Sequence, residues 1–235
     1  MTTHIPFNTL YKADHGWLQS RFHFSFAEYY DRTNMHYGAL RVMNDDIIQP
    51  HTGFDTHPHQ DMEIITYVIC GELTHQDSMG NKERLGRGAV QYLSAGTGIT
   101  HSEKNEGDKE LHLIQIWILP EAKGLVPRYG SKVFDLETRH NKWLHLVGSD
   151  DTESAIPIYQ DANIYVSKLD RGKKLTFELR KNRQVYVKVM EGEVCINDIV
   201  FKEGDAAKNE SEDLDVKALY DVHMLLVEMA VVNLN

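Results

Sequence analysis

The sequence predicts an all-β protein of the sandwich or barrel type, organised as two small domains. Short apolar segments alternate with glycine-containing turns at regular intervals, and the first half carries no long amphipathic helix pattern. The last 75 or so residues repeat the strand rhythm of the first half. A chain of 235 residues with 41% hydrophobic residues is long and apolar enough to fill two packed cores.

Composition excludes several functional classes. The net charge is -10, with 35 acidic against 25 basic residues and no basic run, which argues against direct binding of nucleic acid. The two cysteines, Cys70 and Cys195, exclude a disulfide framework, favour a reducing compartment, and are each expected to be buried. Residues 1–7 lack the apolar core of a signal peptide, and no apolar run approaches the length of a membrane span. We therefore expect a soluble, cytoplasmic protein.

The first 37 residues are rich in aromatic side chains. Phe22, Phe24 and Phe26 alternate with period two, which predicts a strand with an aromatic face. This face could form apolar walls for a planar ligand, or it could belong to the core. His15 and His23 could line a pocket, although histidines in such surroundings more often pack against aromatic neighbours.

The rest of the first half is predicted as short strands separated by turns. We expect strands at 39–43, 64–70, 73–75, 89–93 and 111–119, with turns or loops at 71–72, 76–81, 86–88 and 95–98. The segment 111–119 is almost continuously apolar and is closed by Pro120, so it should be buried on both faces. Residues 126–160, rich in polar and acidic residues with Pro127 and Pro157, are expected to connect the domains 1–125 and 161–235.

Two pairs of side chains indicate a metal site. Side chains two residues apart on a strand point to the same face, so His57 and His59 lie together, as do His101 and Glu103. An isolated His-x-His pair is most often a chance pair on a surface loop. A second pair at the same spacing, also close to glycines, favours a divalent transition metal with open coordination positions. Glu63 would share the face of His57 and His59 on an unbroken strand, and spacing alone does not rank Glu63 against Glu103.

The second half repeats the first half without these ligands. Segment 68–73 aligns with 189–194, and the turn at Gly88 aligns with the turn at Gly204. Counting from these turns without gaps gives the second-copy residues that correspond to His57, His59, Glu63, His101 and Glu103: Glu178, Arg180, Gln184, Lys217 and Leu219. The second domain is therefore expected to bind no metal of the same kind.

Several motifs together resemble those of the pirin family of bicupins. They are Gly53-x3-His57-x-His59-x3-Glu63-x7-Gly71, Gly88…His101-x3-Asn105, Phe24-Ser25-Phe26-x2-Tyr29-x-Asp31, His75-Gln76-Asp77, Ala95-Gly96-x-Gly98-Ile99-x-His101-Ser102-Glu103 and Leu111-His112-x2-Gln115-x-Trp117. The likeness is densest through residues 14–130 and strongest to bacterial pirin-like proteins with quercetin 2,3-dioxygenase activity. It implies a bicupin fold of two packed, jelly-roll-like β-barrels.

The resemblance implies one ligand set. In most cupins the glutamate of the first motif binds the metal, but in pirins the fourth ligand comes from the second motif. The implied ligands are therefore His57, His59, His101 and Glu103, and Glu63 becomes a hydrogen-bonding residue around them. One Fe(2+) ion is the expected metal, and Zn, Ni, Mn, Cu, Co or Cd could occupy the site in a purified sample.

The implied activity is the dioxygen-dependent cleavage of flavonols such as quercetin, with release of carbon monoxide. Glu103 would be the general base for the flavonol 3-hydroxyl. The partners are then a small planar phenolic substrate and dioxygen, with the protein a monomer. One alternative is a metal- or redox-responsive regulatory protein that binds a protein partner. Another is a different cupin reaction, such as isomerisation of a hydroxy-carbonyl compound, on the same ligands.

Overall fold

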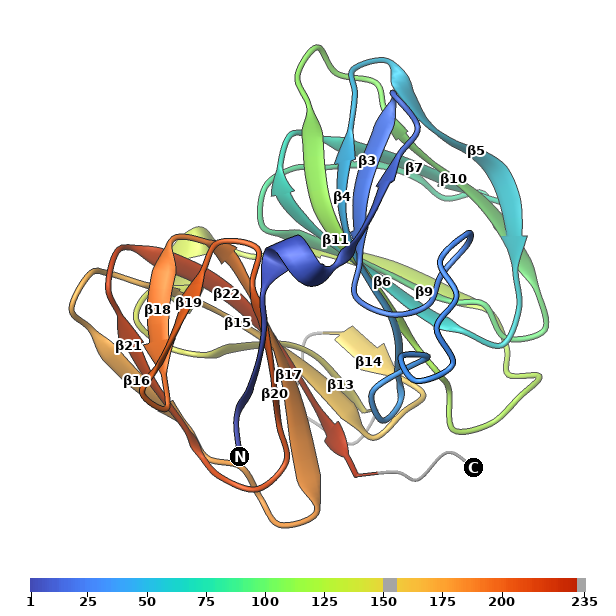
Figure 1. Cartoon of the computed structure of the whole chain (residues 1–235). Coiled ribbons are helices and arrows are strands. Elements are labelled where there is room, and N and C mark those ends of the chain that lie inside the picture. Colours follow the sequence, from blue (N-terminus) through green and yellow to red (C-terminus); the bar gives the residue numbers. More distant parts are fainter. Residues whose placement is uncertain (150–155, 232–235) are drawn as a thin grey trace. The chain divides into compact units, whose positions relative to one another are not determined.

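The computed structural model describes residues 1–149 and 156–231, and confirms an all-β chain with two barrels (Figure 1). Each barrel consists of a seven-stranded sheet and a four-stranded sheet. Within these ranges the two helical elements are single 3-10 turns, η1 (Phe7–Thr9) and η2 (Leu136–Arg139). The described part of the chain contains no helix with the length and apolarity needed to cross a membrane.

The N-terminal barrel is formed by antiparallel strands from the first half of the chain. The order of its seven-stranded sheet is β12 (Arg128–Val133), β9 (Ala89–Ser94), β6 (Glu63–Cys70), β11 (Leu111–Ile118), β4 (Leu40–Ile48), β3 (Leu18–Phe22) and β2 (Tyr11–Asp14). The order of its four-stranded sheet is β5 (Thr52–His59), β10 (Ile99–Asn105), β7 (Leu73–Asp77) and β8 (Lys82–Leu85). Strand β11 is almost entirely buried, as its apolar run predicts.

The C-terminal barrel repeats this order. Its seven-stranded sheet runs β1 (Thr3–Ile5), β20 (Ala206–Asn209), β17 (Arg183–Glu191), β22 (Val222–Ala230), β15 (Ala162–Leu169), β13 (Leu144–Ser149) and β14 (Ile156–Ile158). Its four-stranded sheet runs β16 (Lys174–Phe177), β21 (Leu214–Ala218), β18 (Glu193–Ile196) and β19 (Ile199–Lys202). The equivalent positions of β9, β6, β11 and β4 and of β20, β17, β22 and β15 confirm the repeat seen in the sequence.

The turn glycines that aligned the two halves have the same conformation. Gly71 and Gly192 have φ values of +81° and +86°, which favour glycine. A Cβ atom on Gly71 would lie 2.5 Å from the carbonyl oxygen of Glu110, and one on Gly192 would lie 2.0 Å from that of Asp221. Backbone atoms cannot move aside as a side chain can, so both turns require a residue without a Cβ.

The structure divides the chain differently from the predicted boundaries 1–125, 126–160 and 161–235. One compact unit contains residues 11–134 and 158–160, and the other contains 1–10, 135–157 and 161–235. The first residues belong to the C-terminal unit because β1 pairs with β20, as the blue strand beside β20 shows (Figure 1). The predicted connector contains β12, which pairs with β9, and η2, β13 and β14. Its residues 150–155 lie outside the described part of the chain.

Other differences are local. Strand β4 continues beyond the predicted end at Met43 through Asn44, Asp45 and Asp46. Neither cysteine is buried as expected, because Cys70 at the end of β6 is exposed and Cys195 on β18 is partly exposed.

Candidate metal centre

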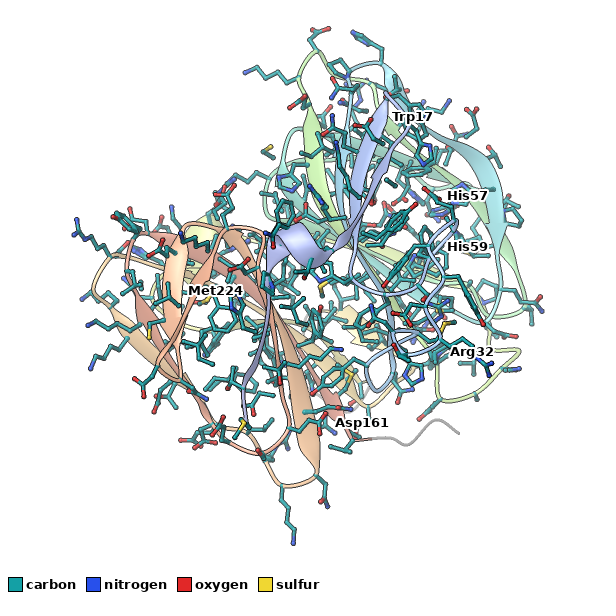
Figure 2. All side chains as sticks on the ribbon, viewed as in Figure 1. Trp17, Arg32, His57, His59, Asp161 and Met224 are labelled. Carbon is teal, nitrogen blue, oxygen red and sulfur yellow. The ribbon has the colours of Figure 1, made fainter. Side chains whose placement is uncertain are left out.

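Three histidines converge inside the N-terminal barrel. His57 and His59 come from β5, and His101 comes from the neighbouring strand β10, where it pairs directly with His57. Their candidate ligand atoms all lie within 4.8 Å of one another. The Nε2 atoms of His57 and His101 are 3.1 Å apart. Figure 2 shows His57 and His59 side by side on this barrel. The strand spacing therefore correctly predicted that His57 and His59 lie together, and the structure brings His101 beside them.

The histidine geometry fits a metal ion. The Nδ1–H group of His57 donates to the carbonyl oxygen of Asp55 at 2.7 Å, which leaves a lone pair on Nε2. Burial, followed by the nearby His101 and His57, lowers the pKa of His59 to about 4. Burial also lowers the pKa of His101, although Glu103 opposes this shift. Neutral imidazoles are the form that binds metals, so the site is prepared for a cation.

A β-bulge adjusts the strand that carries two of these histidines. His101 pairs with His57 and Glu103 pairs with Phe54, so β5 has one more residue than β10 between these pairs. The extra residue turns Phe54 toward the same side as His57, and their ring centroids are 6.2 Å apart. Asp55 is left exposed, where its carboxylate pairs with Lys104.

Glu103 is buried beside the histidines, and side chains of the opposite sheet hold its carboxylate. Thr66 Oγ1 and Gln91 Nε2 each donate to Oε1 at 3.0 Å, and Gln115 Nε2 donates to Oε2 at 2.7 Å. Burial alone would raise the pKa of Glu103, but His101, His75 and these hydrogen bonds outweigh it and hold the pKa below its ordinary value. Glu103 is not among the groups whose ligand atoms lie within 4.8 Å of one another, although it lines the same cavity as His57 and His59.

Glu63 lies in a separate hydrogen-bond network. Strand β5 ends at His59, and the chain turns through Asp61, which has a φ of +49°, before β6 begins at Glu63 in the other sheet. The assumption of an unbroken strand is therefore wrong. The carboxylate of Glu63 accepts hydrogen bonds from Ser94 Oγ, Tyr92 Oη and the Tyr159 backbone amide.

An aromatic cavity of about 420 Å³ opens beside the histidines, within the size range of small-molecule sites. The aromatic side chains that line it are Trp17, Phe22, Phe26, Phe54 and Trp117. The N-terminal aromatic stretch thus contributes walls, whereas Phe24 is buried in the core. Of the two histidines considered for a pocket, His15 lines the cavity and His23 does not.

Sequence reasoning assigned no role to the polar residues of the inner wall. They are Ser20, Asn44, Asp46 and Gln115. Gln115 belongs to the motif Leu111-His112-x2-Gln115-x-Trp117. The acidic pair Asp45-Asp46 within an otherwise apolar strand is the sequence signal that could have indicated Asp46. Burial raises the pKa of Asp46 to about 7, and a hydrogen bond from Ser20 opposes this shift.

Asp46→Asn should stabilise the metal-free protein increasingly as the pH rises. The unfolded chain releases this proton near the ordinary pKa of 3.8, whereas the folded protein holds it to about 7, so Asp46 destabilises the wild type progressively across that window. The free energy of unfolding of the variant relative to wild type should rise by up to roughly 4 kcal/mol between pH 4 and pH 8. Urea denaturation at both pH values measures this. Asp55→Asn, an exposed control on the same barrel, should show no such rise, and a pH-independent difference for Asp46→Asn would contradict the assignment.

Two barrels of this topology, with a histidine cluster in the first that could hold a metal ion, define a bicupin. Sequence comparison is more specific. The Pirin family pattern matches residues 6–118, and the pattern described as the quercetinase C-terminal cupin domain matches residues 134–229. The chain belongs to the pirin family.

Several relatives and solved structures match more than nine-tenths of the chain. A pirin-like protein of Caulobacter vibrioides is 45% identical over 96% of this chain and 98% of its own length. The quercetin 2,3-dioxygenase of Escherichia coli K12 is 42% identical over 92% of this chain and 94% of its own. The crystal structure of YhhW from Escherichia coli has a TM-score of 0.94, with 39% identity and full coverage of both chains. A structure of YhhW in complex with nickel(II) has a TM-score of 0.93, with 38% identity over 99% of this chain and 100% of that one.

The second barrel places apolar residues where the first places the histidines and Glu103. Phe177 on β16 pairs with Leu214 on β21, in the positions where His57 pairs with His101. The segment from Gly204 to Leu214 is shorter than the segment from Gly88 to His101. Counting from the glycine turns without gaps therefore assigns the wrong second-barrel residue to His101.

The next inward pair follows the same pattern. Ile196 on β18 pairs with Val216, as His75 on β7 pairs with Glu103. Ile196, Val216 and Leu214 are buried in the core of this barrel, and Phe177 packs against it. Of the residues counted from the sequence, Glu178, Arg180, Lys217 and Leu219 are therefore not the structural equivalents of the three histidines and Glu103. Gln184 is the equivalent of Glu63, because it pairs with Met229 on β22 as Glu63 pairs with Ile118 on β11. Among the described residues, the histidine cluster of the first barrel is the one candidate metal group.

Proposed function

We propose that this chain is a metal-dependent dioxygenase of the pirin type that cleaves flavonols such as quercetin and releases carbon monoxide. The observation that carries the proposal is the convergence of three histidines at one end of an aromatic cavity, with a buried carboxylate on its inner side. The 42% identity to the Escherichia coli protein named quercetin 2,3-dioxygenase supports it.

His57, His59, His101 and Glu103 would hold one metal ion, which we propose to be Fe(2+). Imidazole and carboxylate ligands suit iron, nickel and other first-row metals, and the related YhhW has been crystallised with nickel(II). When bound, the metal would supply a Lewis-acidic, redox-active centre at which a flavonol oxygen and dioxygen can meet. Glu103 would complete the proposed set, since it and His101 are both buried on the same side of β10.

Glu103 would also accept the proton of the flavonol 3-hydroxyl. The three donors that hold its carboxylate favour the ionised form and fix the orientation of the acceptor oxygens. A carboxylate positioned in this way accelerates proton transfer because it requires no reorientation when the substrate arrives.

The aromatic walls would bind the flat rings and keep water away from the reacting oxygen atoms. Trp117 has its ring centroid 5.0 Å from that of His59, so the apolar wall begins directly at the ligands. Its indole Nε1–H donates to Gln115 Oε1 at 3.2 Å, which links the wall to the side chain that holds Glu103. Trp17 and Phe54 form a second edge-to-face pair of the lining, with centroids 5.1 Å apart.

Steady-state kinetics of the iron-loaded protein test the proposal. We expect a panel of flavonols to be consumed together with dioxygen and with release of carbon monoxide, and small enediols to be poor substrates. Faster conversion of an enediol than of any flavonol would favour a different cupin reaction. No turnover of either class, with a stable protein complex that responds to the redox state of the metal, would favour a regulatory role.

A further inference from the structure

The inner wall of the cavity carries a polar pair that the proposed reaction does not use. Asn44 and Asp46 both project from β4, and they are only 3% and 2% exposed. Asn44 pairs with Gln115 on β11, and Asp46 pairs with Ser20 on β3. Polar side chains are uncommon at such burial unless they have partners, so this pair requires an explanation.

The hydrogen bonds within the protein do not satisfy these two side chains. Asn44 Oδ1 is buried and has no hydrogen-bond partner among residues 1–149 and 156–231. Within the same ranges, the carboxyl group of Asp46 accepts one hydrogen bond, from Ser20 Oγ, although it has two oxygen atoms. Unpaired polar groups in a low-dielectric wall are costly, and a ligand that supplies the missing hydrogen bonds would remove that cost.

The pair lies close to the proposed metal ligands. Gln115 donates to Glu103 at 2.7 Å and is the cross-strand neighbour of Asn44, so one side chain separates the carboxylate from the amide. Side chains directly opposite each other on antiparallel strands are about 5 Å apart at Cβ. A single planar molecule within the cavity can therefore reach both the histidines and Asn44.

We propose that Asn44 and Asp46 form a hydroxyl-binding subsite, which selects phenolic substrates that carry hydroxyl groups in addition to the one bound at the metal. This inference rests on the proposed function. A hydroxyl group both donates and accepts, so it matches a side-chain amide in either orientation and the second oxygen of the Asp46 carboxyl group. A site with buried polar groups discriminates against a ligand that leaves them unpaired, whereas apolar walls alone discriminate weakly.

Anaerobic binding measurements on the metal-loaded protein can test this subsite. Trp17 and Trp117 line the cavity, so quenching of their fluorescence reports occupancy, with Trp143 of the other barrel as background. The probes are 3-hydroxyflavone, which has only the metal-binding hydroxyl, and quercetin, which has further ring hydroxyls. In Asn44→Leu the affinity for quercetin should fall about tenfold and that for 3-hydroxyflavone should not change. Phe54→Leu, a control in the apolar wall, should weaken both probes by the same factor.

Each result separates the subsite from the proposed function. Equal losses for both probes in Asn44→Leu, or no loss for either, would overturn the subsite, even if the wild type cleaves flavonols. If Asn44→Leu loses affinity only for quercetin but the wild type cleaves no flavonol, the subsite stands and the proposed reaction is wrong. If the wild type binds neither probe, both proposals fall. Should Asn44→Leu not fold, Asn44→Ala removes the same amide and is interpreted in the same way.

Discussion

Glu103→Gln should lower flavonol turnover by at least ~10²-fold and weaken metal binding. The substitution keeps the size of the side chain but removes the negative charge and most of the basicity of a proposed ligand and base. A positioned general base contributes about 10²–10⁴-fold, so the lower end of that range is the least expected loss. The measurements are kcat for a flavonol and metal content per chain, which should be near one equivalent in the wild type.

Glu63→Gln is a closely matched control. Both glutamates are buried in the same barrel, and each carboxylate accepts three hydrogen bonds. Each glutamine would therefore lose a comparable number of acceptor contacts and one negative charge, while only Glu103 borders the histidines. Glu63→Gln should keep about one equivalent of metal and lose less than ~10-fold in turnover. The assignment fails if Glu63→Gln loses the metal while Glu103→Gln retains both metal and turnover.

Gly53→Ala should destabilise the N-terminal barrel and weaken metal binding at the same time. Gly53 has a φ of +150°, and a Cβ atom there would lie 2.4 Å from the Glu103 carbonyl oxygen and 2.5 Å from Lys104 Cα. The methyl group would push β5 away from β10, and His57 and His101 lie on those two strands. Positive-φ strain together with this overpacking costs about 3 kcal/mol.

Thermal unfolding and a nickel(II) titration measure the two effects of Gly53→Ala. The control is Gly80→Ala in the turn after β7, where φ is +94° and a Cβ atom would meet nothing within 4 Å. This control should lose only about 1 kcal/mol, the strain of the backbone conformation, and keep its metal affinity. Equal effects of the two substitutions would show that the close approach at Gly53 is relieved without moving the ligands.

The sequence predicted the parts of the structure that depend on local pattern. Period-two spacing correctly predicted that His101 and Glu103 are buried on one face of a strand, and repeated glycine turns predicted the duplicated barrel. The sequence could not predict the position of Glu63, because the chain turns at Asp61 between β5 and β6, and these two strands lie in different sheets.

Features that depend on pairing between distant strands were not predictable. The bulge that turns Phe54 inward appears only in the register of β5 against β10. Asn44 and Asp46 face the cavity because β4 lies between β3 and β11. The short segment at residues 3–5 gives no local sign that its partner is Ala206–Asn209.

The pairing of β1 with β20 affects how this protein is completed during translation. Strand β1, at the edge of the C-terminal barrel, is synthesised about 200 residues before its partner β20. At ~5–20 residues per second, β1 has no partner for roughly 10–40 s, while the strands of the N-terminal barrel are synthesised. The C-terminal barrel can close only after β20 has been synthesised, so a chain released before that point would display β1 as an unpaired edge strand.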